Sequence, residues 1–133
     1  MLDASITLAW SFEDERTPPV DAVLDQISDF GAVAPQLWPL EVANTLRLAA
    51  RRGRIPLDRV AGILSSLTAL DIEIDTETVG RAWTTILNIA DKHDLTVYDA
   101  SYLELAIRRG LPLATGDKAL VRAARAEAVS VLP

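Results

Sequence analysis

Apolar residues along this chain fall into two alternating patterns. Recurrence at helical spacing predicts helices over residues 5–12, 18–30, 37–53, 56–70, 78–94, 95–110 and 116–128. Short apolar or alternating runs between them predict strands over residues 2–4, 32–35, 71–75, 111–115 and 129–133. Because strands alternate with helices, the pattern predicts an α/β fold with a mostly parallel central sheet, organised as one domain over residues 1–133.

In such a sheet, ligands bind beyond the carboxyl ends of the strands, where the following helices begin. Four acidic residues are predicted at that edge. Asp3 ends the first strand, and Asp117 opens the helix that follows the last but one strand. Glu41 and Asp99 lie in the first turns of their helices. These acids are far apart in sequence, so only the fold could bring them together.

The composition excludes several kinds of functional site and classes of protein. With 13 Lys and Arg against 19 Asp and Glu, the net charge is −6, whereas a generic nucleic-acid binder is basic. The chain has no Cys and a single His, which excludes disulfides, thiolate chemistry and a multi-histidine zinc site. No apolar run is long enough to cross a membrane, and the first residues lack the basic region of a signal peptide, so we expect a cytoplasmic protein.

Clustered carboxylates repel each other, and in a partly buried site this repulsion raises their pKa values. A hard divalent cation resolves the conflict, because Mg²⁺ and Mn²⁺ prefer oxygen ligands and can bridge carboxylates to phosphate oxygens. Four acids without His or Cys therefore suggest an Mg²⁺ or Mn²⁺ site for phosphodiester hydrolysis. The metal would activate a water and stabilise charge on the scissile phosphate.

The acids also have purely structural interpretations. Thr96 and Asp99, within "LTVYDASYLELAIRRG", have the spacing of a capping box, and Asp117 after Gly116 could be a cap or turn residue. Two other acidic groups, each confined to one element, are interpreted as solvent-facing: Asp71, Glu73 and Asp75 on a strand, and Asp21, Asp25 and Asp29 on a helix.

Two other functional classes stay open on these residues. A haloacid-dehalogenase phosphatase would carry a second Asp two residues after Asp3, where this chain has Ser5, and a receiver domain would carry paired acids after its first strand. A non-enzymatic interaction module would use the same acids as helix caps. Metal affinity separates the interaction module from the enzymes, and a phosphatase assay separates a phosphatase-type hydrolase from a nuclease.

Four motifs in order along the chain resemble those of PIN-domain ribonucleases, in particular the VapC-type toxins of bacterial toxin–antitoxin pairs. They are "LDAS", "PLEVANTL", "LTVYDASYLELA" and "LATGDKAL", and the resemblance extends from Leu2 to about Ala124. It implies a PIN-like three-layer α/β/α fold and an Mg²⁺- or Mn²⁺-dependent endoribonuclease. It also implies a homodimer and a cognate antitoxin whose tail covers the groove near the helices 37–52 and 57–70.

Carried over residue by residue, the acidic tetrad of that family falls on Asp3, Glu41, Asp99 and Asp117. The three aspartates would bind metal directly or through water, and Glu41 would be a ligand or would orient the attacking water. Ser5, Asn44 and Thr115 match polar positions that support the site. The family has a few more apolar residues before its first aspartate, where this chain has only Met1 and Leu2.

A basic group stands in and just after the last turns of the helix 37–53: Arg47, Arg51, Arg52 and Arg54, with Arg47, Arg51 and Arg52 as the candidates for a contact with RNA or antitoxin. A helix C-terminus favours cations, so a solvated role is one interpretation. The other is contact with RNA phosphates or with an acidic antitoxin segment. Among the remaining side chains, His93 is expected on the surface near a helix end, and Trp10, Trp38 and Trp83 are expected in the core.

Overall fold

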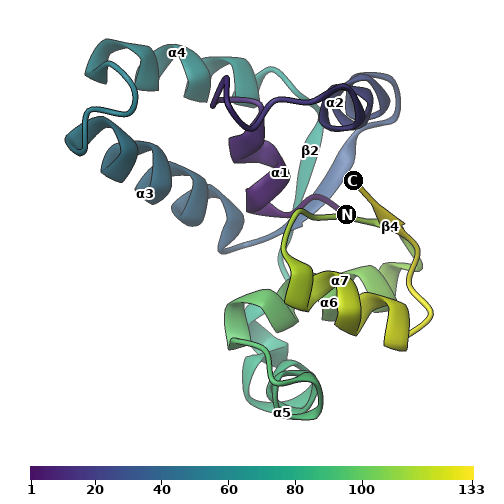
Figure 1. Ribbon diagram of the computed structural model, residues 1–133. Helices are drawn as coiled ribbons and strands as arrows, with labels where there is room; N and C mark the ends of the chain where they lie inside the picture. The colour runs from purple at the N-terminus through teal and green to yellow at the C-terminus, as the bar shows by residue number, and fades with distance from the viewer.

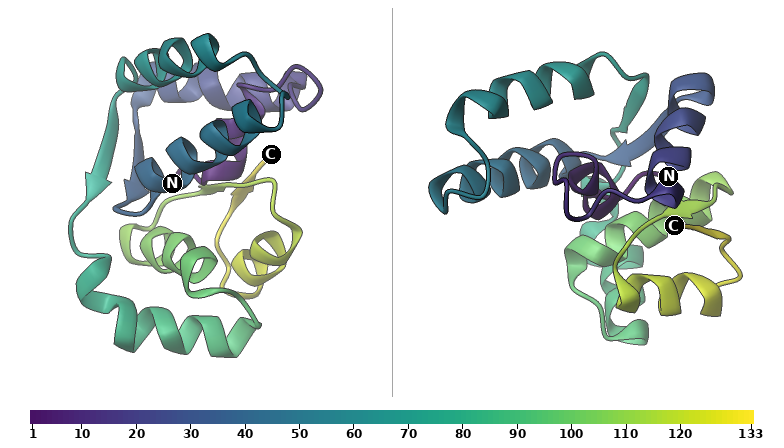
Figure 2. Two further views of the ribbon diagram at one scale, coloured as in Figure 1. Left: turned by 90° about the vertical axis from the view of Figure 1, so that its left-hand side faces the viewer. Right: turned by 45° about the horizontal axis from the view of Figure 1, so that its top comes forward.

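The structure is a computed structural model that describes all residues, 1–133. A central β-layer separates two layers of helices (Figure 1). One layer holds α1 (Ala4–Ala9), α2 (Pro18–Phe30), α3 (Trp38–Arg51) and α4 (Leu57–Thr68). The other holds α5 (Leu87–His93), α6 (Val97–Arg109) and α7 (Lys118–Ala126). Both views of Figure 2 show the same separation, so the predicted three-layer α/β/α architecture is confirmed.

The β-layer consists of two parallel pairs: β1 (Ala32–Pro35) with β2 (Ile72–Asp75), and β3 (Leu113–Ala114) with β4 (Val131–Leu132). The first residues of the chain join these pairs. The Leu2 N–H donates to the Val33 carbonyl, and the Asp3 N–H donates to the Ala114 carbonyl, both at 3.0 Å. The predicted first strand is thereby reduced to a bridge between Leu2 and Ala114, because α1 begins directly after Asp3.

Local sequence sets the ends of the helices. Two prolines open α2, where their missing N–H groups cost nothing, and Gly31 ends it with a φ of +73°. A Cβ atom at Gly31 would lie 2.9 Å from the Asp71 carbonyl oxygen. Glycine therefore lets the chain turn from α2 and still approach the start of β2 closely.

The core is built around α6. Its residues from Ala100 to Ala106 are all buried, and four of them share one apolar cluster with Leu2, Leu46 and Leu113, which have no exposed surface. Burial of this stretch fixes the position of α6 in the core. Asp99 lies in the first turn of the helix, directly before the buried stretch. None of the helices is long and apolar enough to span a bilayer.

Residues 79–93 are helical, but the prediction of one regular helix over residues 78–94 is wrong. It begins as a 3₁₀ turn (η1, Val79–Arg81), continues as a π-helical turn (η2, Ala82–Ile86), and only then becomes α5. A π turn carries an extra residue, which shifts the direction in which the following side chains point. Trp83 is consequently 92% exposed, so its predicted core position is also wrong, whereas Trp38 is buried as predicted.

The solvent-facing interpretation of Asp75 is wrong, because α6 covers the end of β2. Asp75 and Glu104 are only 4% and 3% exposed, and both bind Arg108. The Arg108 guanidinium donates to both carboxylate oxygens of Asp75 at 3.1 and 3.0 Å, and its Nε donates to Glu104 at 3.0 Å. Burial alone would raise the pKa of Asp75, but hydrogen bonds from Arg108 and Thr78 lower it on balance.

His93 ends α5 as predicted but is partly buried, because its Nε2 lies 2.6 Å from the Glu127 carboxylate that follows α7.

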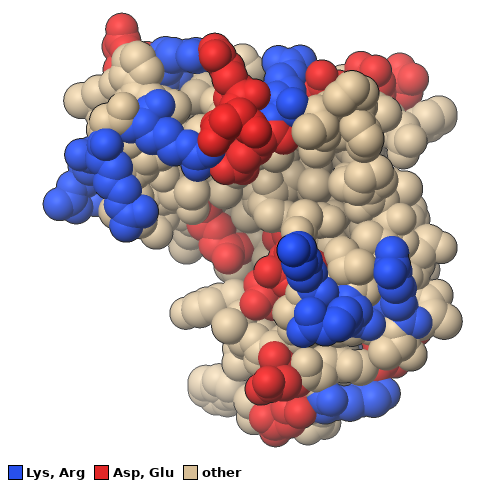
Figure 3. All heavy atoms as spheres, in the orientation of Figure 1, with Lys and Arg blue, Asp and Glu red and all other residues tan.

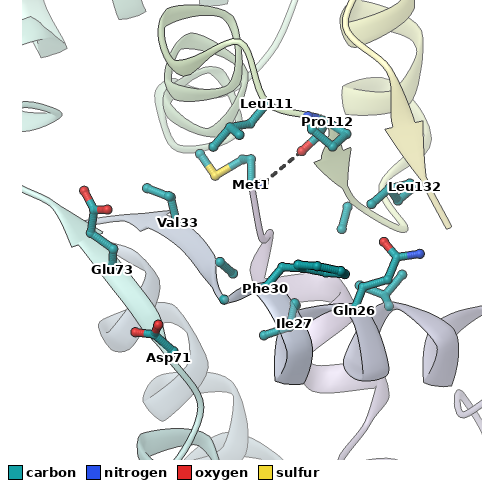
Figure 4. A pocket seen from close by; sticks show the side chains of 14 residues that line it. Met1, Gln26, Ile27, Phe30, Val33, Asp71, Glu73, Leu111, Pro112 and Leu132 are labelled. Atoms are coloured by element: carbon teal, nitrogen blue, oxygen red, sulfur yellow. Dashed lines mark hydrogen bonds between the residues drawn. The ribbon is translucent and has the colours of Figure 1, made fainter.

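A cavity of about 430 Å³ is lined by Met1 and by residues of α2, β2 and β3 (Figure 4). The Met1 amino group donates to the Pro112 carbonyl at 2.8 Å, and burial lowers the pKa of this amine to about 6. The cavity walls are mainly apolar, including Ile27 and Phe30, so it offers no converging set of reactive groups.

Candidate active site

The four predicted acids all stand where helices begin. Asp3 precedes α1, Glu41 and Asp99 lie in the first turns of α3 and α6, and Asp117 is the N-cap residue of α7. Figure 1 shows α1, α3 and α7 starting close to one another at the centre of the molecule. In the space-filling view, acidic side chains lie in a recess between the upper and lower halves (Figure 3).

Hydroxyl groups hold Asp3 in place. Ser5 Oγ and Thr115 Oγ1 both donate to Asp3 Oδ2, at 2.5 and 2.7 Å. The same hydroxyl oxygens accept backbone hydrogen bonds, from the Gly116 N–H at 2.9 Å and from the Asp117 N–H at 3.1 Å. The loop that carries Asp117 is therefore fastened to Asp3, although the two residues are more than a hundred positions apart in sequence.

Asp117 caps α7 as predicted, and Thr96 caps α6, but the Asp99 carboxylate bonds to the Thr96 hydroxyl and not to a backbone N–H, so only half of the predicted capping box is formed. Thr96 Oγ1 accepts from the Asp99 N–H at 3.0 Å and donates to Asp99 Oδ2 at 2.7 Å, while Asp117 Oδ1 accepts from the Leu120 N–H at 2.7 Å. Each carboxylate thus has one oxygen engaged at its own helix start. The second oxygen, Oδ1 of Asp99 and Oδ2 of Asp117, has no hydrogen-bond partner in the chain.

Glu41 is half-buried and accepts a short hydrogen bond at Oε2 from the Tyr102 hydroxyl. Tyr102 is buried on α6, one turn after Asp99, and its pKa is raised by burial and by the neighbouring Glu41. The hydroxyl therefore stays protonated and serves as a fixed donor. The sequence analysis missed Tyr102, although its position one helical turn after Asp99 was a usable signal.

The acids perturb one another electrostatically. Burial raises the pKa of Asp3, the Ser5 and Thr115 hydrogen bonds oppose this rise, and the charge of Asp99 adds to it. Burial also raises the pKa of Glu41, the Tyr102 hydrogen bond opposes it, and the charges of Asp3 and Asp99 add to it. Asp3, Glu41 and Asp99 are thus close enough to repel one another, in surroundings that are partly shielded from water.

No cation of the chain relieves this repulsion. Nine of the 19 acidic residues form ion pairs, and none of these nine belongs to the tetrad. Among the ten that remain, seven are exposed. The other three are Asp3, which is buried, and Glu41 and Asp99, which are partly exposed, and none of them has a cationic partner. Sheltered, unpaired carboxylates are costly, so their grouping calls for an external positive charge.

The donor set fits a hard divalent cation, although no three His, Asp or Glu side chains lie close enough together to enclose one. Mg²⁺ keeps several of its waters and is bound through one or two carboxylates, so full convergence is not required. All the available ligands are oxygens, and the free carboxylate oxygens of Asp99 and Asp117 could turn to a cation. Asn44 is exposed on α3 and makes no side-chain hydrogen bond.

We expect Glu41→Gln to raise the stability of the metal-free protein at neutral pH. The folded-state pKa of Glu41 is raised, so ionised Glu41 destabilises the fold, and this cost appears as the pH rises from the unfolded-state value through the folded one. Glutamine keeps an acceptor for Tyr102 and removes the charge. Urea unfolding in EDTA should show a higher midpoint for the variant at pH 7.5 and equal midpoints near pH 3.5; a lower midpoint at pH 7.5 would contradict the electrostatic account.

Comparison with known proteins supports one family. The family model described as PIN domain matches residues 1–126. The chain is 30% identical over 120 residues to "Ribonuclease VapC3" of Pyrobaculum aerophilum, and the alignment covers 90% of each protein. It also resembles the crystal structure of PAE2754 from Pyrobaculum aerophilum, with a TM-score of 0.67 and 25% identity over 92% of this chain and 82% of that one.

Proposed function

This chain belongs to the PIN-domain family, and on that basis we propose that it is an Mg²⁺- or Mn²⁺-dependent endoribonuclease that acts as the toxin of a toxin–antitoxin pair. One observation carries the proposal: the three acids that are buried or half-buried and lack a cationic partner, Asp3, Glu41 and Asp99, perturb one another electrostatically at the starts of α1, α3 and α6. Similarity to a ribonuclease over 90% of both chains supports RNA as the substrate.

The four acids Asp3, Glu41, Asp99 and Asp117, together called the acidic edge, are proposed to have two different roles. Asp3, Asp99 and Asp117 would hold the cation, with Ser5 and Thr115 keeping Asp3 in place. The bound cation would lower the pKa of a water and offset the charge that develops on the scissile phosphate.

Glu41 is proposed to orient the attacking water and accept its proton. Tyr102 occupies its Oε2, which leaves Oε1 available to the water. Burial raises the pKa of the Glu41 carboxylate, although the Tyr102 hydrogen bond opposes this rise, and a more basic carboxylate is a better proton acceptor.

Two surfaces fit the partners that this proposal requires. A groove of about 460 Å³ between α3 and α4 has apolar walls that include Trp38, Val42 and Leu67, and α4 has no fully buried residue. An antitoxin segment with an apolar face would cover this groove, and Arg47, Arg51 and Arg52 at the end of α3 would suit acidic residues in it. Asn44 is proposed to support the site from the same helix.

A homodimer is proposed through a separate apolar surface. Val79, Trp83 and Leu87 recur every four residues along η1, η2 and α5, and they are 68%, 92% and 41% exposed. Tyr98, at the start of α6, is 65% exposed. Such an apolar surface is unusual on a monomer. Sedimentation should give twice the 14.4 kDa of one chain, and a mass of one chain would refute the dimer.

The activity is tested by incubating the purified chain with total RNA and with p-nitrophenyl phosphate in the presence of Mn²⁺ or Mg²⁺. We expect RNA to be cut into discrete fragments, cleavage to stop in EDTA and to return when Mn²⁺ is restored. Hydrolysis of p-nitrophenyl phosphate with intact RNA would favour the phosphatase-type alternative. Intact RNA and no phosphatase activity would favour the interaction module. The cytoplasm is proposed as the place of action, because the substrate class proposed for this chain is RNA.

A further inference from the structure

We infer that the outer face of α7 is an RNA-backbone track, formed by Lys118, Arg122 and Arg125, that leads the substrate into the acidic recess. This inference rests on the proposed ribonuclease function and adds to it a binding surface that the family motifs do not assign. It comes from the way in which positive charges are distributed over the structure.

The 13 Lys and Arg residues divide sharply between paired and unpaired side chains. Seven of them form ion pairs: Arg16, Arg54, Arg59, Arg81, Lys92, Arg108 and Arg109. The six without an acidic partner occur in two groups of three. One group is Arg47, Arg51 and Arg52 at the end of α3, and the other is Lys118, Arg122 and Arg125 on α7.

The α7 cations occupy one face of an amphipathic helix. Leu120, Ala123 and Ala124 are buried against the core, whereas Lys118, Arg122 and Arg125 are exposed. Positions four and three residues apart lie along the same side of a helix, so the three cations form a line. From the first to the last, this line rises roughly 10 Å at 1.5 Å per residue.

Helix-end electrostatics does not explain this arrangement. A helix C-terminus favours cations, which suffices for Arg125 in the last turn of α7. Lys118 is the first residue of the helix, where the macrodipole disfavours a positive charge, and Arg122 lies in the middle. Lys118 and Arg122 therefore stand where neither the dipole nor an acidic partner stabilises them.

The track is continuous with the recess. Lys118 directly follows Asp117, whose N–H is bound to Thr115 and through it to Asp3. In the space-filling view, Lys and Arg side chains gather over α7 on one side of the recess and over the end of α3 on the other, with acidic side chains between them (Figure 3). A phosphodiester chain that followed both groups would pass over the acids.

This charge order fits a nucleic acid better than an acidic protein segment. A chain with one phosphate per nucleotide can contact cations on both sides, and a cation held by the acidic residues between them would accept a phosphate there. An acidic peptide would meet the same cations but would bring further carboxylates to an edge where carboxylates already repel one another. We therefore assign the α7 track to RNA.

The test compares two triple variants that each remove three positive charges. Lys118→Gln/Arg122→Gln/Arg125→Gln removes the track, and Arg16→Gln/Arg59→Gln/Arg109→Gln removes exposed cations whose ion pairs involve no residue of α7 or its caps. Glutamine has nearly the same helix propensity as Lys and Arg, and equal far-UV circular dichroism and melting would show that both variants fold. The probe is a fluorescein-labelled 20-nucleotide single-stranded RNA in EDTA, titrated at several salt concentrations.

For single strands, the slope of log K against log salt is about −0.7 for each phosphate contacted, so loss of the track should make the slope shallower by about 2. The control variant should keep the slope of the wild type. With Mn²⁺ present, the track variant should have a raised KM and a kcat close to that of the wild type, since it loses uniform binding. Equal slopes for the two triple variants would overturn the assignment of the α7 track to RNA. Cleavage by the wild type is measured separately, so this result would not affect the proposed ribonuclease function. A wild type that neither binds nor cuts RNA would overturn both.

Discussion

We expect Asp99→Asn to reduce RNA cleavage by at least about 10²–10³-fold, the scale on which loss of one group that stabilises transition-state charge slows an enzyme. The variant should fold normally. The Asp99 N–H can still donate to Thr96, and an asparagine oxygen can still accept from the Thr96 hydroxyl, so the helix start is kept. Only the negative charge is lost, and with it the affinity for the cation.

Thr96→Ala is the matched control for this variant. It removes the N-cap of α6, which should cost about 1 kcal/mol of stability, but it leaves the Asp99 carboxylate in the first turn. We expect Thr96→Ala to melt earlier and to retain most of its cleavage. If the two variants behaved the other way round, with cleavage kept in Asp99→Asn, the carboxylate would be a cap and nothing more.

The largest loss of stability is expected for Arg108→Met. Arg108 is the common partner of two buried carboxylates, Asp75 and Glu104, and it ties the end of β2 to α6. Removing one partner of a buried ion pair typically costs about 3–5 kcal/mol, because the remaining charge is left desolvated. That is a large part of the 5–15 kcal/mol or so by which a domain is stable. The free energy of unfolding in urea measures the change.

Arg109→Met provides the comparison. Arg109 lies next in the chain and binds Glu73 at 2.9 Å, but both side chains are exposed, so the pair is worth roughly 0–1 kcal/mol. A loss of less than about 1 kcal/mol for Arg108→Met would mean that water replaces Arg108 and that the network is not what anchors β2.

The sequence predicted well those features that depend on local pattern. Helix periodicity located α3, α4, α6 and α7, and the rule that acids at strand ends and helix starts share one edge brought Asp3, Glu41, Asp99 and Asp117 into consideration together. The two interpretations of Asp99 proved compatible. The structure confirms Thr96 as the cap of α6, with the Asp99 carboxylate bound to its hydroxyl, and the free Oδ1 of Asp99 leaves room for the metal role, which stays a proposal.

The features that the sequence did not reveal depend on contacts between distant elements. Strand alternation placed Asp75 outward, but α6 supplies Arg108 to cover it. The tryptophan at position 83 is exposed because a π turn interrupts a stretch that looks like continuous helix. The partnership of Tyr102 with Glu41 joins residues 61 positions apart. The α7 cations, like those at the end of α3, differ from the seven other Lys and Arg residues in having no acidic partner, and ion pairs between distant elements cannot be read from local sequence.

The central claim is that the acidic edge binds a divalent cation, and calorimetric titration of Mn²⁺ into the purified protein tests it without knowledge of the substrate. The account predicts a saturable heat for the wild type and a rise in melting temperature. It predicts the same behaviour for Asp71→Asn, which changes an exposed acid outside the tetrad, and strongly weakened binding for Asp99→Asn. Equal binding by all three proteins, or binding by none, would contradict the claim.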